Sequence, residues 1–357
     1  MPGAVHGGRV QEAARRLNLP LEKIADFSAN INPLGQPEGL REVLVSAMDS
    51  IGHYPEIGAE SLTAALAKSA DLPLSAVVAG SGSTPLIYQL ARLLRPKKAV
   101  VVAPAFAEYG AALTLAGCPV EYCRCAEEDD FLFLPAKARA LLATKPDCVI
   151  LANPANPTGQ LVPPETMELL LTASGIGDGF RLVIDEAFMD FCLEKRSVEP
   201  LLRERPKAIV LKSLTKIFAV PGLRLGYLAS GDGALTDAFR ENAEPWSINT
   251  LAQAAGLYFL TLRDFLAQTP SYTADLRQRL LAGVAPYLTA FPSAANFIMG
   301  RLQKGAKRPL IDHLFERGIL IRDLDGMPGL ADGYLRLAVR PPDQINRLLE
   351  ALKEFYA

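Results

Sequence analysis

Short apolar runs alternate with helical stretches along much of this chain, and this alternation constrains its fold more than any other feature. The pattern begins at about residue 46 and continues to about Asp232. Several runs are apolar throughout rather than alternating, as expected for strands that are covered on both faces. Such a succession predicts an α/β fold built around a sheet. The strand candidates are Ala76–Ala79, Ala99–Ala103, Val120–Cys125, Cys148–Ala152, Leu182–Ile184, Ala208–Leu211 and Leu225–Ala229.

A second, smaller α+β domain is predicted after about Asp232, where the pattern changes. Three helical stretches run from Ala234 to about Leu288, and the helix Ala274–Leu288 is expected to join the two domains. Further strand signals and a closing helix follow at Asn296–Met299, Ile319–Arg322, Tyr334–Ala338 and Pro342–Phe355. We therefore predict an N-terminal arm that forms part of the small domain (1–45), a large domain (46–240) and a small C-terminal domain (241–357).

Composition favours a small-molecule enzyme of the cytoplasm. Half of the 357 residues are apolar, and 37 basic against 39 acidic residues give a net charge of −2. Without a basic excess, no nucleic-acid or anionic membrane surface is expected. No apolar run approaches the roughly 18 to 20 residues that span a bilayer, and residues 1–20 lack the apolar core of a signal peptide. Cys123 and Cys125 have no second pair at zinc spacing, so the five cysteines are expected to be free, mostly buried thiols, with no metal.

Asp185 and Lys216 are the first candidates for chemistry, because each closely follows a predicted strand. A carboxylate at the carboxyl edge of a sheet needs a partner, which a protonated ring nitrogen would supply. An N-cap or a metal ligand is the alternative for Asp185. Lys216 ends the sequence Ser-Leu-Thr-Lys, and a lysine amine with a lowered pKa can form an imine. Ser213 and Arg224 are suited to a phosphate. An exposed loop lysine is the alternative; the companion motifs of penicillin-binding proteins are absent.

Two loops follow predicted strands and add polar groups. Residues 79–84 read Ala-Gly-Ser-Gly-Ser-Thr, and small residues there expose N–H groups at a helix N-terminus, which suits a phosphate. Residues 153–159 read Asn-Pro-Ala-Asn-Pro-Thr-Gly, and the prolines restrict a loop that presents the Asn156 amide. Taken singly, the glycine segment is usually explained as a plain turn between strand and helix, and the Asn-Pro loop is about equally well explained as a turn without a ligand.

The order of these motifs carries a resemblance. Glycine turn, Asn-Pro loop, Asp-Glu-Ala, Ser-x-x-Lys and arginine occur in succession, and in this the chain resembles fold-type I pyridoxal-phosphate (PLP) enzymes of the aspartate aminotransferase group over nearly all 357 residues. The resemblance implies a large PLP-binding domain with a mostly parallel, mixed seven-stranded sheet plus a smaller α+β domain. It implies PLP as cofactor, Lys216 as the Schiff-base lysine and Asp185 as the partner of the ring nitrogen. The further cofactor contacts it implies are Ser81, Gly82, Ser83, Phe106, Asn156, Ser213, Arg224 and Tyr54.

Two subfamilies share this core, and the chain resembles the L-threonine-O-3-phosphate decarboxylases more than the histidinol-phosphate aminotransferases. The segments that favour the decarboxylases are 6–8, 26–35, 104–110 and 221–227, together with Phe188 where the aminotransferases generally have tyrosine. The resemblance implies that Arg336 and Asn156 hold the substrate carboxylate. It implies that the phosphate is held by Arg322, His6, the Gly7 amide and Asn30. Strand arginines are also commonly exposed without a role.

The implied reaction is decarboxylation of L-threonine O-3-phosphate to (R)-1-amino-2-propanol O-2-phosphate for cobalamin synthesis. Transamination of histidinol phosphate uses the same residues and remains the alternative. A PLP-binding regulator is a more distant alternative, because such proteins normally carry a DNA-binding domain and here the fold begins by about residue 26. The expected partners are a small phosphorylated amino acid and a second copy of the chain, with Tyr54 reaching the neighbouring subunit.

Overall fold

The computed structural model describes residues 7–176 and 179–357. Its central feature is a seven-stranded sheet with the strand order β2-β8-β7-β6-β5-β3-β4. β8 runs antiparallel to both of its neighbours, and the other neighbouring strands are parallel. The predicted α/β fold with a mixed sheet is thus confirmed. The strands are β2 (Val77–Gly80), β3 (Ala99–Ala103), β4 (Val120–Arg124), β5 (Cys148–Ala152), β6 (Arg181–Asp185), β7 (Ala208–Ser213) and β8 (Gly226–Ser230).

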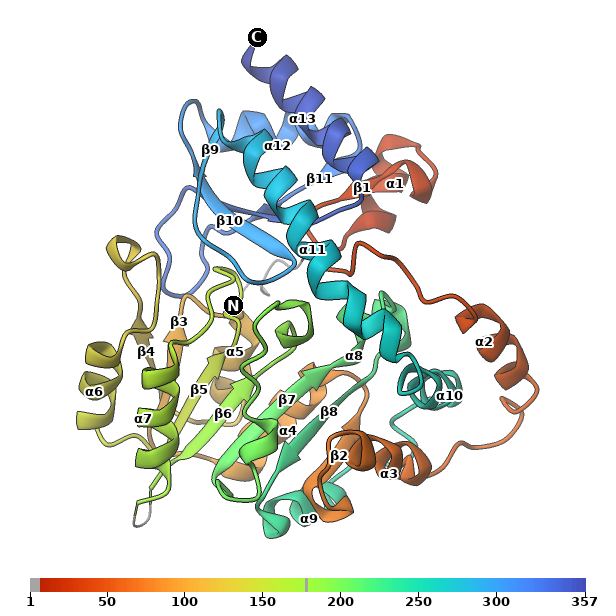
Figure 1. Cartoon of the computed structure of the whole chain (residues 1–357), viewed down its shortest axis with the longest axis vertical. Coiled ribbons are helices and arrows are strands. Elements are labelled where there is room, and N and C mark those ends of the chain that lie inside the picture. The colour runs from red at the N-terminus through yellow and green to blue at the C-terminus, as the bar shows by residue number, and fades with distance from the viewer. Residues whose placement is uncertain (1–6, 177–178) are drawn as a thin grey trace.

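Helices cover both faces of this sheet (Figure 1). On one face, α4 (Ser83–Leu94), α5 (Ala107–Leu115) and α9 (Gly233–Glu241) contribute to a core that includes Val183 and Leu211. On the other face, α3 (Glu60–Ser69), α6 (Pro135–Ala143) and α7 (Pro164–Ser174) contribute to a core that includes Ile184 and Val210. Successive residues of β6 and β7 therefore belong to different cores, as the alternation of side chains along a strand requires.

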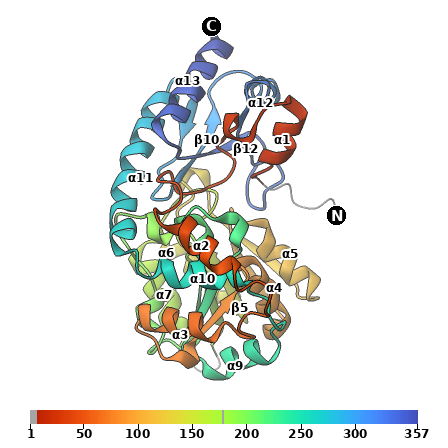
Figure 2. The ribbon, with the colours of Figure 1, turned by 90° about the vertical axis from the view of Figure 1, so that its right-hand side faces the viewer.

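The smaller domain combines the two ends of the described chain (Figures 1 and 2). β1 (Ala25–Asp26) pairs in parallel with β11 (Ile319–Leu320), and the paired residues are 294 positions apart in the sequence. A second sheet, of order β12-β13-β10-β9, is antiparallel. The further elements of this domain are α1 (Val10–Leu17), β9 (Leu288–Ala290), β10 (Phe297–Leu302), α12 (Lys307–Glu316), β12 (Arg322–Asp323), β13 (Tyr334–Ala338) and α13 (Pro342–Tyr356).

Helix α11 (Arg263–Val284) connects the two parts, and it begins eleven residues before the predicted joining helix. Helix α10 (Thr250–Phe259) packs against α2 (Leu40–Met48) and α3, and its Phe259 belongs to the large core. A domain division at residue 240 remains a proposal, and this packing favours placing it within α11 instead.

Glu127 joins the two domains on the side of β4. Its Oε2 accepts a hydrogen bond of 2.5 Å from the Tyr334 hydroxyl, and its Oε1 lies 3.1 Å from Arg301 Nη1. In the described part of the chain, no helix is long and apolar enough to cross a membrane.

Candidate active site

Asp185 ends β6 as a buried carboxylate. Its Oδ2 accepts a hydrogen bond of 2.7 Å from the Tyr109 hydroxyl, and its Oδ1 accepts one of 2.9 Å from the Ala187 amide. Burial raises the pKa of Asp185, while these bonds and the charge of Lys216 act in the opposite direction. Among the described residues, no basic side chain forms an ion pair with it. Asp185 is therefore suited to bind a cationic group of a ligand, since no described basic side chain pairs with it.

Lys216 lies in the short helix α8 (Leu214–Ile217), directly after β7. Its Nζ donates a hydrogen bond of 3.0 Å to the Ser213 hydroxyl. Burial lowers the pKa of Lys216 to about 8; Asp185 opposes this shift and Arg224 adds to it. The side chain is half-buried. A large fraction of the amine is therefore neutral near pH 8, which a nucleophile requires.

We expect the cofactor-free protein to capture PLP faster as pH rises. Only the neutral amine attacks an aldehyde, and a pKa of about 8 for Lys216 means that its protonated fraction falls through this range. The second-order rate constant, measured by stopped-flow absorbance, should rise by about tenfold from pH 7 to pH 9 and then level off. A rate that keeps rising towards pH 10.5 would show that the pKa of Lys216 is unshifted.

The glycine turn and Arg224 meet at one place. Gly82 adopts φ 88°, and a Cβ atom there would lie 2.6 Å from Arg224 Nη2. A Cβ atom on Gly226, at the start of β8, would lie 2.9 Å from the Ser83 amide nitrogen. Side chains at either glycine would thus close the space in which the turn, the start of α4 and Arg224 approach each other. Ser81 is half-buried within this turn. The Ser83 amide and the Arg224 guanidinium thus border one space, and donors of these kinds suit a phosphate.

Phe106 lies next to the Asp185 environment. It caps the start of α5, and its ring contacts the ring of Tyr109 edge-on at a centroid distance of 5.7 Å. Because Tyr109 bonds Asp185, Phe106 is in position to cover a ring that the carboxylate holds. Stacking on a cofactor remains a proposal for this residue.

Arg336 binds the loop after β5. Its Nη1 donates to Asn156 Oδ1 at 2.5 Å, and its Nη2 donates to the Ser28 carbonyl at 2.8 Å. The buried Nε has no hydrogen-bond partner among the described residues. Burial and the charge of Arg322 lower the pKa of Arg336 to about 9, against the opposing effect of Asp26. A bound carboxylate would give Nε a partner and raise this pKa again.

Arg322 lies beside Arg336, since the two residues are register partners in β12 and β13. Asp323, the next carboxylate, is engaged by Lys307 at 2.6 Å. A pocket of about 200 Å³ lies between α1 and β12, and its lining includes Gly7, Ser28 and Arg322. Gly7 and Arg322, two of the residues predicted to hold the substrate phosphate, therefore line the same cavity.

The other substrate and subunit contacts fall into three cases. Asn30 is buried, and its Oδ1 has no hydrogen-bond partner in the described segments. His6 lies outside the described residues. Tyr54 is 80% exposed and stacks against Trp246, with ring centroids 4.6 Å apart. Within one chain, no contact joins Tyr54 to the other predicted site residues that the structure describes, so its role stays a proposal that needs a second chain.

Three contributors were not assigned a role from the sequence: Tyr109, Ser28 and Asn32. Asn32 Nδ2 donates to the carbonyl of Ile217 at 2.7 Å, and its backbone amide donates to the carbonyl of Lys216 at 3.1 Å. Asn32, in the N-terminal segment, therefore holds the backbone of α8 at Lys216 and Ile217. Tyr109 belongs to segment 104–110, which carries part of the resemblance, but its role was not readable because a hydrogen bond to a residue 76 positions away leaves no local pattern.

Tyr109→Phe should weaken cofactor chemistry without removing the cofactor. The substitution removes one of the two donors that hold Asp185 ionised, so the carboxylate is held less firmly as an anion. We expect kcat to fall by about tenfold, as loss of one hydrogen bond to a charged group predicts, together with a shifted pH profile of the cofactor absorbance. Tyr122→Phe, on edge strand β4, is the matched control. An unchanged pH profile would show that Tyr109 only fills space.

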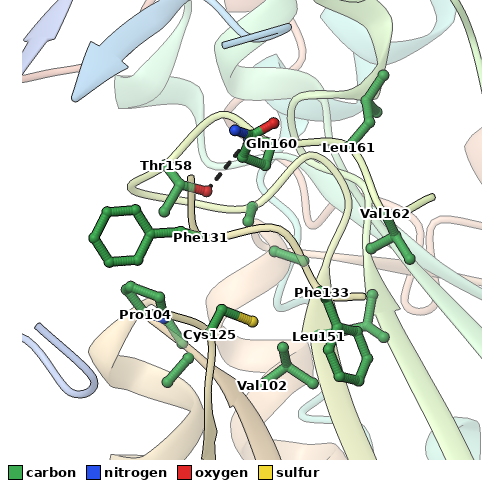
Figure 3. A pocket seen from close by; sticks show the side chains of 14 residues that line it. Val102, Pro104, Cys125, Phe131, Phe133, Leu151, Thr158, Gln160, Leu161 and Val162 are labelled. Carbon is green, nitrogen blue, oxygen red and sulfur yellow. Dashed lines mark hydrogen bonds between the residues drawn. The ribbon is translucent and has the colours of Figure 1, made fainter. Parts of the chain in front are cut away.

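The void drawn in Figure 3 is not part of this site. It lies beneath the loop after β5, and its lining includes Phe131, Phe133 and Leu151. Its volume of about 20 Å³ is enough for a single water molecule. It cannot hold a cofactor or a substrate.

The arrangement fits PLP at each end that the structure can test. Asp185 is a buried carboxylate, and Gly82 and Arg224 border a space whose donors suit a phosphate. Lys216, in α8 directly after the strand that ends at Ser213, offers an amine of lowered pKa. Fold and site together define a PLP-dependent enzyme of fold type I.

Comparisons with known proteins agree. The sequence profile described as aminotransferase class I and II matches residues 22–352, and the chain belongs to this family. The chain is 37% identical to threonine-phosphate decarboxylase of Salmonella typhimurium, over 98% of this chain and 96% of that one. It is 33% identical to histidinol-phosphate aminotransferase of Roseiflexus castenholzii, over 97% and 93%. The structure of histidinol-phosphate aminotransferase from Sinorhizobium meliloti in complex with pyridoxal-5'-phosphate has a TM-score of 0.84 and 23% identity, over 99% and 95%.

Proposed function

We propose that this protein decarboxylates L-threonine O-3-phosphate to (R)-1-amino-2-propanol O-2-phosphate, a building unit of cobalamin. The observation that carries this proposal is the adjacency of Arg322 and Arg336 on one sheet face, with Asp323 drawn away by Lys307. Two neighbouring, partly desolvated cations call for two anionic groups. A substrate with a carboxylate at one end and a phosphate at the other supplies both. Histidinol phosphate itself has no carboxylate, so in transamination only the amino donor would engage Arg336 in this way.

Bound PLP supplies an electron sink for the pair left on Cα when carbon dioxide departs. The residues of the chain do the rest. Arg336 and Asn156 orient the carboxylate, and Arg322 holds the phosphate, so that the substrate is gripped at both ends. Asp185 holds a proton at the ring nitrogen. Lys216 Nζ returns a proton to Cα, for which a pKa of about 8 is suitable.

Transamination is the rival reaction, and a substrate comparison separates the two. The holoenzyme is incubated with O-phospho-L-threonine, without any oxo acid, and carbon dioxide is measured. Stoichiometric release over many turnovers is expected. Oxo-acid-dependent turnover of histidinol phosphate, without carbon dioxide from O-phosphothreonine, would overturn the proposal.

Arg322→Gln tests the phosphate end of the site. Loss of a charge-assisted hydrogen bond should raise KM for O-phosphothreonine by about 10- to 100-fold, while the already weak binding of unphosphorylated threonine stays the same. Arg308→Gln, which changes an exposed arginine on α12, is the control. Equal effects of Arg322→Gln on both substrates would show that Arg322 does not bind the phosphate.

We also propose that two copies associate. Large apolar side chains are exposed on α2, on the segment after it, on α10 and on the segment before α10, and Tyr54 is one of them. The exposed residues are Val45, Met48, Ile51, Tyr54, Ile57, Trp246 and Leu257. Sedimentation should give a dimer that Met48→Asp dissociates; a wild-type monomer would contradict this.

Free thiols at all five cysteines support a reducing compartment such as the cytoplasm.

A further inference from the structure

A buried ion pair lies directly beside the cofactor residues in the sequence, yet on the other face of the sheet. Lys212 Nζ lies 2.9 Å from Glu186 Oε2, with the two side chains 8% and 0% exposed. Glu186 follows Asp185, and Lys212 precedes Ser213. The ion pair thus links the residue after Asp185, which ends β6, to the residue before Ser213, which ends the adjacent strand β7.

Alternation along the strands places the pair and the cofactor residues on opposite faces. Lys212 is the register partner of Tyr227, which belongs to the core shared with Ile184 and Val210. Asp185 instead receives its hydrogen bond from Tyr109, a member of the core under α4 and α5. The sheet backbone therefore separates the ion pair from the cofactor side.

Further bonds fix the pair on its own face. Glu186 Oε2 accepts from the Ser197 hydroxyl at 2.6 Å, and Oε1 accepts from the Val198 amide at 2.7 Å. Tyr227 donates at 2.8 Å to Glu199, a second carboxylate near Lys212. Although burial acts to lower it, the pKa of Lys212 is raised well above its ordinary value by the surrounding carboxylates, so Lys212 stays charged.

We propose that Glu186 and Lys212 form a positioning clamp that sets, from behind the sheet, the relative placement of Asp185 and the Ser213–Lys216 segment. A buried ion pair adds little net stability over an apolar pair of the same volume, so its contribution here is geometric. The ring-nitrogen partner ends β6 and the lysine lies in α8 after β7, and both must reach one rigid cofactor. Functional groups of this kind must be held within about 0.5 Å of the required geometry.

The experiment compares four variants with the wild type by three readouts that need no catalysis. They are the dissociation constant of PLP, the pH midpoint of the visible cofactor band, and the unfolding temperature of the cofactor-free protein. Glu186→Gln and Lys212→Met break the pair, the double variant removes both charges, and Lys212→Arg keeps the cation. Arg181→Gln, which breaks the Arg181–Asp232 pair of 2.6 Å at the opposite end of β6, is the matched control.

The double variant decides the outcome, because it leaves no buried charge unpaired and should fold even where the single variants do not. We expect it to recover the unfolding temperature and still bind PLP about tenfold more weakly, the lower end of what loss of a residue that supports a metal ligand costs, with a shifted pH midpoint. Lys212→Arg should keep both the dissociation constant of PLP and the pH midpoint near their wild-type values. Arg181→Gln should lower only the unfolding temperature. If the double variant binds and titrates like the wild type, the pair is only structural and the proposal fails.

Discussion

Lys216→Ala should abolish the visible absorbance of the purified protein and lower kcat by about 10⁴-fold or more. The amine has two functions, since it holds the cofactor covalently and moves a proton at Cα. Alanine can serve neither. The half-buried position of Lys216 and its single bond to Ser213 mean that few packing contacts are lost, so the variant should fold.

The control for this experiment is Lys68→Ala, an exposed lysine at the end of α3, which should leave both absorbance and kcat unchanged. The unfolding temperature of the cofactor-free Lys216→Ala protein separates loss of chemistry from loss of fold. A variant that keeps the visible band would show that another amine carries the cofactor.

Asp185→Asn should lower kcat by about 10³-fold, at the upper end of what loss of one preorganised charge costs. A neutral amide cannot stabilise a protonated ring nitrogen, so the ring withdraws electrons less strongly. The shape is retained: the amide oxygen can still accept from Ala187, and the Tyr109 hydroxyl can turn to accept from the amide nitrogen. The loss should therefore appear in kcat rather than in the fold.

The stability of the same variant checks this interpretation. Burial raises the pKa of Asp185 above its unfolded value, so ionising this carboxylate destabilises the cofactor-free fold as pH rises through the folded pKa. Asparagine removes that cost. The cofactor-free Asp185→Asn protein should melt at the same or a higher temperature than the wild type at pH 8. A large drop in both melting temperature and kcat would show that Asp185 is mainly a structural residue.

Local patterns were sufficient for the sheet and for the residues at its edge. All seven strands of the large sheet were predicted within one or two residues, since buried apolar runs between turn residues leave few alternatives. β7 extends two residues beyond its prediction, and the edge strand β4, whose residues are exposed or half-buried, is the one without a buried apolar run. Asp185 and Lys216 follow such runs directly, so their place at one edge was readable. The family resemblance supplied the roles.

What the sequence did not reveal depends on contacts over long separations. β1 and β9 have two and three residues, too few for a recognisable pattern, and β1 exists only through pairing with β11. The Tyr109–Asp185 hydrogen bond and the Asn32 contacts with α8 likewise join distant segments. The domain division also depends on packing, because α10 is a helix in either domain and its contacts with α2 decide where it belongs.

Covalent attachment of the cofactor tests the central claim most directly. The holoenzyme is reduced with borohydride, which fixes an imine as a stable amine, and the modified peptide is sequenced by mass spectrometry after proteolysis. We predict the pyridoxyl group on Lys216 alone. Finding it on Lys212 or another lysine, or finding no modified lysine in protein saturated with PLP, would contradict the account.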